Sequence, residues 1–165
     1  MVKNTTKLLN EITISPLQLS HQERISYFRL QKKVNKVYPY AQKAKIQLRE
    51  IENDLMYADT KKEKRRISKL HERWLREHFT EDLKKLRRSE GRILIKLIHY
   101  ETGMSSYDLI KEYRNGLTAL LWQKLAKLYD GNLKTTYKPE DVKEDQWISH
   151  ILRQIEVHDT FKKDD

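Results

Sequence analysis

Residues 27–58, YFRLQKKVNKVYPYAQKAKIQLREIENDLMYA, place an apolar or aromatic side chain at every third or fourth position without a break. These positions are Tyr27, Leu30, Val34, Val37, Ala41, Ala44, Leu48, Ile51, Leu55 and Ala58. Spacings that alternate between three and four residues are typical of a helix that packs lengthwise along another helix. Because the spacing continues through Pro39, we expect one kinked helix over residues 21–58; two collinear helices broken near Tyr38 are the alternative.

A second helix is predicted directly after the first. Thr60 and Glu63 match a capping box, as Ser20 and Glu23 do at the start of the first helix. The apolar positions of the second helix are Ile67, Leu70, Trp74, His78, Phe79, Leu83 and Leu86. The short connection predicts an antiparallel hairpin over residues 20–88, which buries both apolar stripes and turns its Lys and Arg side chains outward.

Residues 89–160 have the pattern of a compact helical bundle. Residues 93–98 are apolar nearly all round and predict a buried helix that Gly103 ends. Further helices are expected from Ser105 and over residues 117–129. The last predicted helix begins at Pro139 and buries Val142, Ile148, Ile151, Leu152 and Ile155.

The two ends of the chain complete the predicted organisation. Residues 1–19 form an N-terminal segment, in which the alternation at residues 12–14 allows one short strand beside residues 133–137. Residues 161–165 are expected to fray. The predicted fold is all-α: a long kinked antiparallel helical hairpin followed by a compact C-terminal helical bundle, both in one cooperative unit.

Composition narrows the possible functions. The 165 residues include 34 Lys and Arg against 24 Asp and Glu, a formal net charge of +10, and no cysteine. The lack of cysteine excludes disulfides, thiol catalysis and cysteine-ligated metals. No apolar run reaches the about 18 residues that a membrane span needs, and residues 1–10 lack the apolar core of a signal peptide.

Catalytic motifs are not found in the sequence. His71 and His78 lack the zincin spacing, so we expect solvated or seam-edge histidines, and no nucleophile elbow, P-loop or dinucleotide-binding glycine pattern occurs. Glu90 and Glu101 would lie about 16 Å apart on one helix, too far to act on one glycosidic bond. We expect one to be a partner of the helix dipole and the other a solvated acid, with Ser89 as an N-cap. No metal and no cofactor are predicted.

Two surface features are candidates for binding. Two basic runs lie on the predicted hairpin, Lys61, Lys62, Arg65 and Arg66 in the first and Lys84, Lys85, Arg87 and Arg88 in the second. A protein partner is favoured, although an anionic lipid or nucleic acid would use the same charges. Tyr38, Pro39 and Tyr40 form the other candidate, because the kink at the proline is expected to expose one of the tyrosines.

Five segments together resemble a bacterial family of unknown function. They are residues 37–41 (VYPYA), 86–98 (LRRSEGRILIKLI), 101–103 (ETG), 122–127 (WQKLAK) and 132–134 (NLK). Members of that family show K-V-Y-P-Y-A, R-S-Q-G-K-I-L-I-K-L-I-D-R-E-T-G and F-W-Q segments. The likeness covers residues 10–157, and this chain departs from the family pattern at residues 90, 99–100 and 130–131.

The resemblance implies no activity, cofactor or catalytic residue, because none is established for the family. Since members are often exported, it implies the periplasm or cell envelope if the chain is a trimmed precursor, and the cytoplasm otherwise. The preferred interpretation is a non-enzymatic binding or assembly protein of the bacterial cell envelope, which engages a protein or anionic partner through its basic hairpin. Nucleic-acid binding is one alternative. The other is an enzyme of unknown class with a polar site in the C-terminal bundle at Ser89, Glu101, Trp122 and Gln123.

Overall fold

The structure is a computed structural model, which describes residues 17–112 and 134–163. It is all-α, as predicted, and none of the described residues lies in a strand. The helices are α1 (His21–Met56), α2 (Lys61–Lys84), α3 (Arg88–Thr102), α4 (Ser106–Glu112) and α6 (Lys143–Lys163). The predicted strand at residues 12–14 and the predicted helix over residues 117–129 lie outside the described residues.

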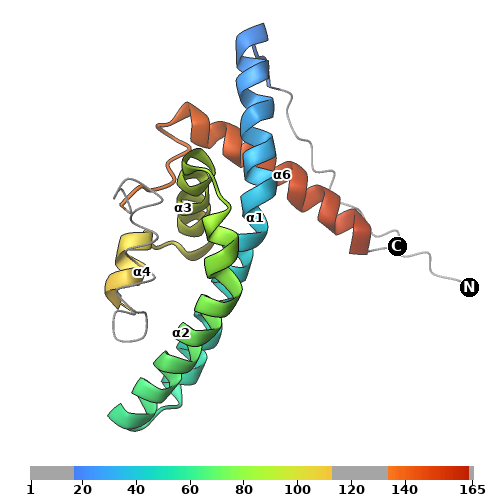
Figure 1. Cartoon of the computed structure of the whole chain (residues 1–165). Helices are drawn as coiled ribbons and strands as arrows, with labels where there is room; N and C mark the ends of the chain where they lie inside the picture. The colour runs from blue at the N-terminus through green and yellow to red at the C-terminus, as the bar shows by residue number, and fades with distance from the viewer. Residues whose placement is uncertain (1–16, 113–133, 164–165) are drawn as a thin grey trace, which may run out of the picture.

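Helix α1 is continuous, so the prediction of a single helix is confirmed and the broken alternative is wrong. The Glu23 N–H donates to the Ser20 Oγ (3.4 Å), and the Ser20 N–H donates to a Glu23 carboxylate oxygen (2.8 Å), which is the predicted capping box. Pro39 is exposed within the helix, and the axis of α1 changes direction about half-way along (Figure 1). The missing proline N–H therefore bends the helix without ending it.

Helix α2 folds back along the second half of α1 and forms the predicted antiparallel hairpin (Figure 1). The Glu63 N–H donates to the Thr60 Oγ1 (3.1 Å), which caps the first turn of α2. Two predicted seam positions are wrong, because Leu70 is 58% exposed and His78 is also exposed. His71 is buried against α1 instead, since both of its ring nitrogens find hydrogen-bond partners there.

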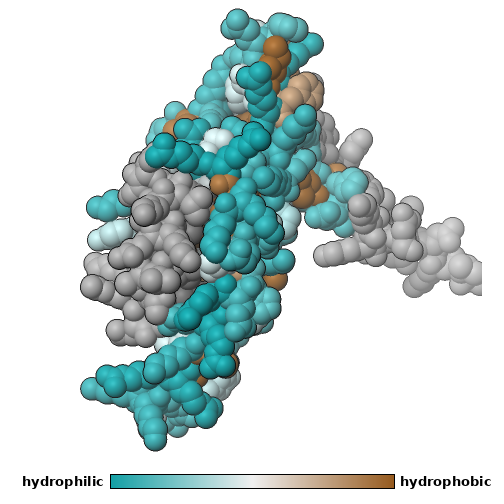
Figure 2. Space-filling view, in the orientation of Figure 1, coloured by the Kyte–Doolittle hydropathy of each residue, from teal (hydrophilic) through white to brown (hydrophobic). Residues whose placement is uncertain are grey.

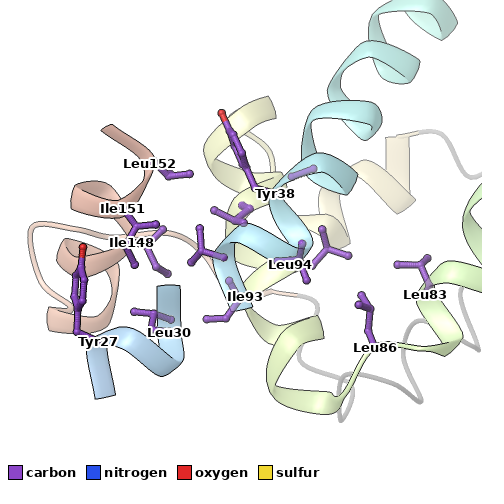
Figure 3. Packing of buried hydrophobic residues seen from close by; sticks show 14 of the residues in the cluster. Tyr27, Leu30, Tyr38, Leu83, Leu86, Ile93, Leu94, Ile148, Ile151 and Leu152 are labelled. Carbon is purple, nitrogen blue, oxygen red and sulfur yellow. The ribbon is translucent and has the colours of Figure 1, made fainter. Parts of the chain in front are cut away.

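The hydrophobic core lies where the first half of α1 meets α3, α6 and the end of α2. It contains Tyr27, Leu30, Val34, Val37, Tyr38, Ala41, Phe79, Leu83, Leu86, Ile93, Leu94, Leu97, Ile148, Ile151 and Leu152. Figure 3 shows most of these side chains and the different helices from which they come. Helix α3 is the main neighbour of α1, as its nearly all-apolar stretch requires. The hairpin and the C-terminal helices therefore share one core, and α1 belongs to both.

Hydrogen bonds donated by backbone N–H groups fix both ends of α3. Gly103 has a φ of 73°, in the left-handed region, and its N–H donates to the His99 carbonyl (2.8 Å), which confirms the predicted glycine cap. At the other end the N-cap is Arg87, not Ser89 as predicted. The reason is that the Glu90 carboxylate reaches back and accepts a hydrogen bond from the Arg87 N–H (2.8 Å).

The predicted start of α4 is confirmed, and the predicted start of α6 is wrong. Ser105 caps α4 as predicted, since its Oγ accepts a hydrogen bond from the Asp108 N–H (3.1 Å). Helix α6 begins after Val142 rather than at Pro139, because the Val142 N–H donates to the Lys138 carbonyl (2.9 Å) in a preceding turn. Val142 is consequently exposed, whereas the other predicted apolar positions are buried at Ile148, Ile151 and Leu152 and half-buried at Ile155.

A buried ion pair joins α3 to α6. The Lys96 Nζ lies 2.5 Å from an Asp145 carboxylate oxygen and 2.9 Å from a Glu144 carboxylate oxygen. Asp145 is 0% exposed, and its other oxygen accepts a hydrogen bond from the Lys138 N–H (2.9 Å). Because both oxygens of Asp145 have donors, the charge is buried without being left unpaired.

Candidate anion-binding face of the helical hairpin

The first half of α2 carries a continuous group of exposed cations. We call this set the basic face of α2, and it consists of Lys61, Lys62, Arg65, Arg66, Lys69 and Arg73. At about 100° per residue these positions fall within an arc of about 140°, and they span about 18 Å along the helix. The buried His71 points to α1 from the opposite side. The basic face is therefore turned away from the hairpin interface.

The basic face is not neutralised by carboxylates. Within the part of the chain that the structure describes, none of its six cations forms an ion pair. Glu72, an acid inside the same arc, is buried and pairs with Arg76 (2.7 Å). An open hollow of about 790 Å³ follows this side of the helix and is lined by Thr60, Lys61, Lys62, Glu63, Arg65, Arg66 and Lys69. Figure 2 shows that the visible side of α2 is mostly hydrophilic.

A buried polar contact holds α2 in register on α1. The His71 Nδ1 lies 2.7 Å from the Gln47 amide nitrogen, and its Nε2 lies 2.7 Å from an Asp54 carboxylate oxygen. Since the amide donates to Nδ1, the ring proton sits on Nε2 and is donated to Asp54. Sequence reasoning placed His71 among solvated or seam-edge histidines but missed both partners. The available signal was the spacing of Gln47 and Asp54, seven residues apart and so on one side of α1.

The second predicted basic run is separate from the first. It begins about 35 Å further along α2. Lys84 pairs with Glu81 (2.5 Å) and Lys85 with Asp82 (3.5 Å), so acids of the same helix partly neutralise this run. Its other members, Arg87 and Arg88, are exposed. The structure therefore does not bring the two runs together on one surface.

The bend at Pro39 does not expose the tyrosines on either side of it. Tyr38 is 6% exposed and lies in the core, so the predicted exposure is wrong for this residue. Burial, followed by a hydrogen bond and the charge of Glu101, raises the pKa of the Tyr38 hydroxyl. Tyr40 is half-buried, with its ring centroid 6.5 Å from that of Phe79. The proline instead faces water, where solvent can hydrogen-bond the carbonyl group that its missing N–H leaves without a partner. Partner binding by these residues stays a prediction.

The predicted polar site in the C-terminal bundle is described only in part, because Trp122 and Gln123 lie outside the described residues. Glu101 is not a solvated acid, since its side chain is 7% exposed and lies 2.6 Å from the Lys45 Nζ. Ser89 is half-buried in the first turn of α3, about 18 Å along the helix from Glu101. These two residues are therefore not brought together.

Glu90 anchors the start of α3 to α1. Its carboxylate lies 2.8 Å from the Lys36 Nζ and accepts the Arg87 N–H, as a partner of the helix dipole is expected to do. Burial acts to raise the pKa of this carboxyl, but the hydrogen bonds from Lys36 and the Arg87 N–H outweigh it and leave the pKa below its ordinary value. The carboxylate is therefore held ionised as a structural contact.

The described residues contain neither a cluster of metal-ligand side chains nor a helix suited to span a membrane. Within residues 17–112 and 134–163, no three His, Cys, Asp or Glu side chains come together as metal ligands would. In the same ranges, no helix combines the length and the apolar character that crossing a bilayer requires.

No curated protein and no solved structure matches the chain. One family model does match, over residues 3–154. This range includes the basic face of α2, the whole of α1 and α3, and the ion pair that joins α3 to α6. The chain therefore belongs to the family described as domain of unknown function (DUF4294).

Proposed function

We propose that this protein is a non-enzymatic binding or assembly protein of the bacterial cell envelope, which engages a partner through the basic face of α2. The observation that carries the proposal is the set of six exposed cations on one side of a helix, with no ion pair to any of them in the described part of the chain. Like charges one turn apart on a helix repel one another. An approaching anionic surface relieves that repulsion, and the positive potential of the face attracts it.

An acidic protein surface is the proposed partner. Arg65, Arg66 and Arg73 present guanidinium groups, which bind carboxylates with two parallel hydrogen bonds. The contact of His71 with Gln47 and Asp54 fixes the hairpin, so little conformational freedom is lost when a partner docks. Charge complementarity of this kind mainly speeds association and sets specificity, and salt weakens it.

Crosslinking in cells, followed by a binding measurement, tests the proposal. A photo-crosslinking residue at Lys62 captures the partner, whose affinity is then measured for the wild type and for Lys61→Glu/Arg65→Glu/Lys69→Glu. The matched control is Lys32→Glu/Lys43→Glu/Arg49→Glu, which makes the same charge change at exposed positions of α1. We expect the first variant to bind at least about tenfold more weakly and the control to stay within about twofold. Equal affinities for the wild type and the first variant contradict the proposal.

A salt titration with nucleic acid tests the alternative partner. If the partner were nucleic acid, log K would fall linearly with log salt, with a slope set by the number of phosphates contacted. If such binding is observed and the charge-reversal variant loses it, the partner is nucleic acid and not a protein.

Fractionation of cells that produce the natural gene product tests the location. Recovery in the periplasm or at the membrane supports the envelope, and recovery in the cytosol contradicts it.

A further inference from the structure

A cleft separate from the basic face lies where the start of α6 meets the first half of α1, at the crossing of the two helices in Figure 1. Its volume is about 300 Å³, at the lower end of the range for small-ligand pockets. It is lined by Ser26, Arg29, Leu30, Lys33, Lys143, Glu144 and Trp147, and we call it the α1–α6 cleft. The cleft is therefore sized for one small ligand.

Two cations on the α1 wall of the cleft are unpaired. Arg29 and Lys33 are one helical turn apart, so their side chains lie next to each other on the same face. Within the described residues, neither forms an ion pair. A guanidinium beside an ammonium offers one planar pair of donors and one point charge, which together match a group with several oxygens and two negative charges.

The carboxylate in the wall does not cancel these charges. Glu144 is occupied on both oxygens, by Arg92 (2.9 Å) and by Lys96 (2.9 Å). Lys143 contacts Glu23 and lies 5.6 Å from the centroid of the Trp147 ring. The charged residues that line the cleft, counted together with their ion-pair partners, are the cations Arg29, Lys33, Arg92, Lys96 and Lys143 and the carboxylates Glu23, Glu144 and Asp145. The cations exceed the carboxylates by two, which is the charge that a dianion would balance.

The remaining walls give the cleft a fixed shape. Leu30 is buried in the core, and the Trp147 ring is held edge-on by Tyr27 at a centroid distance of 6.1 Å. The Ser26 hydroxyl adds a neutral donor on the α1 side. Apolar walls beside the cations lower the local polarity, which strengthens the attraction of an anion inside the cleft compared with one in open water.

We infer that the α1–α6 cleft binds a phosphate dianion, either as free inorganic phosphate or as the phosphate of a small headgroup. Arg29 and Lys33 hold its oxygens, and Trp147 forms the apolar wall beside it. The inference does not depend on the proposed function, because no residue of the cleft belongs to the basic face of α2.

Calorimetric titration of the full chain tests the inference. The ligands are inorganic phosphate and glycerol 3-phosphate, at constant ionic strength, since salt screens charges beyond about 10 Å at 0.1 M. The test variant is Arg29→Gln/Lys33→Gln, which removes both charges but keeps long side chains that favour helix. The matched control is Lys32→Gln/Lys43→Gln, which removes two exposed charges of the same helix outside the cleft. Circular dichroism checks that both variants keep the helical content of the wild type.

The expected result is one site per chain in the wild type and the control, with a Kd of about 1 mM or tighter, and at least about tenfold weaker binding by the test variant. Affinities for the two ligands within about threefold identify free phosphate as the ligand, and clearly tighter glycerol 3-phosphate identifies a headgroup. The absence of saturable binding to either ligand overturns the inference. It is also overturned if the test variant and the control bind with equal affinity.

Discussion

The His71 Nε2 on α2 lies 2.7 Å from a carboxylate oxygen of Asp54 on α1, while the other ring nitrogen contacts the Gln47 amide. The middle of the hairpin is thus joined by a buried polar group with a partner at each ring nitrogen, next to an apolar seam. The orientation of the basic face depends on this contact, because His71 and the six cations stand on opposite sides of one helix.

Replacing His71 by alanine is expected to destabilise the protein by about 1–3 kcal/mol, because the buried Gln47 amide loses its partner. Urea unfolding followed by circular dichroism measures the change in the midpoint. Glu77→Ala, an exposed position of the same helix, is the control and should stay within about 0.5 kcal/mol of the wild type. Equal midpoints for the two variants would show that the His71 contacts do not stabilise the hairpin.

Replacing Lys96 by methionine is expected to cost about 3–5 kcal/mol, because it leaves the fully buried Asp145 without its cation. Arg92→Met removes an exposed partner of Glu144 and should cost less than about 1 kcal/mol. Both changes remove one positive charge from α3, so net charge cannot explain a difference between them. The idea of a structural ion pair fails if denaturant unfolding gives the two variants the same free energy.

The decrease in stability at acid pH should include the loss of the contribution of the Glu23 carboxylate. The Lys143 ammonium and the Ser20 N–H donate to this carboxylate and lower its pKa from 4.5 to about 2. A carboxyl with a lowered pKa in the folded state contributes stability above pH 4.5 and loses that contribution as the pH falls to about 2. Between these pH values the wild type should therefore lose more stability than Glu23→Gln. Glu77→Gln should follow the wild type, and parallel curves for wild type and Glu23→Gln would contradict the prediction.

Gly103→Ala is expected to cost about 1–2 kcal/mol, because the φ of 73° is unfavourable for a residue with a Cβ. Apart from Gly103 itself and its two chain neighbours, no heavy atom of the described residues lies within 4 Å of an added Cβ, so the cost is backbone strain alone. Asparagine tolerates this conformation better than alanine does. Thermal unfolding should rank the wild type first, Gly103→Asn second and Gly103→Ala last, and a stable alanine variant would mean that the end of α3 can rearrange.

Local sequence signals predicted the helices well. The alternating spacing before and after Pro39 predicted one long α1, and the capping side chains of Ser20, Thr60 and Ser105 predicted three helix starts. These signals work because each involves residues within a few positions of one another.

Contacts between distant segments were not predictable in the same way. Lys96 and Asp145 are 49 residues apart, and Lys45 and Glu101 are 56 apart. No periodicity links such residues, so Glu101 could only be interpreted as solvated. The exposure of Leu70 was not predicted for a similar reason. Hydrophobicity alone does not indicate that His71, which has two partners on α1, takes the place of Leu70 in the seam.

The sharing of α1 between the core and the hairpin has a hydrodynamic consequence. At 1.5 Å per residue its 36 residues extend over about 54 Å. A compact chain of this length would have a radius of gyration of about 15 Å, which corresponds to a sphere only about 40 Å across. The protein should therefore experience more friction in solution than a sphere of 20.0 kDa and elute early from a gel-filtration column. Its mass in solution is better determined by light scattering, because elution volume alone would overstate the mass of one copy.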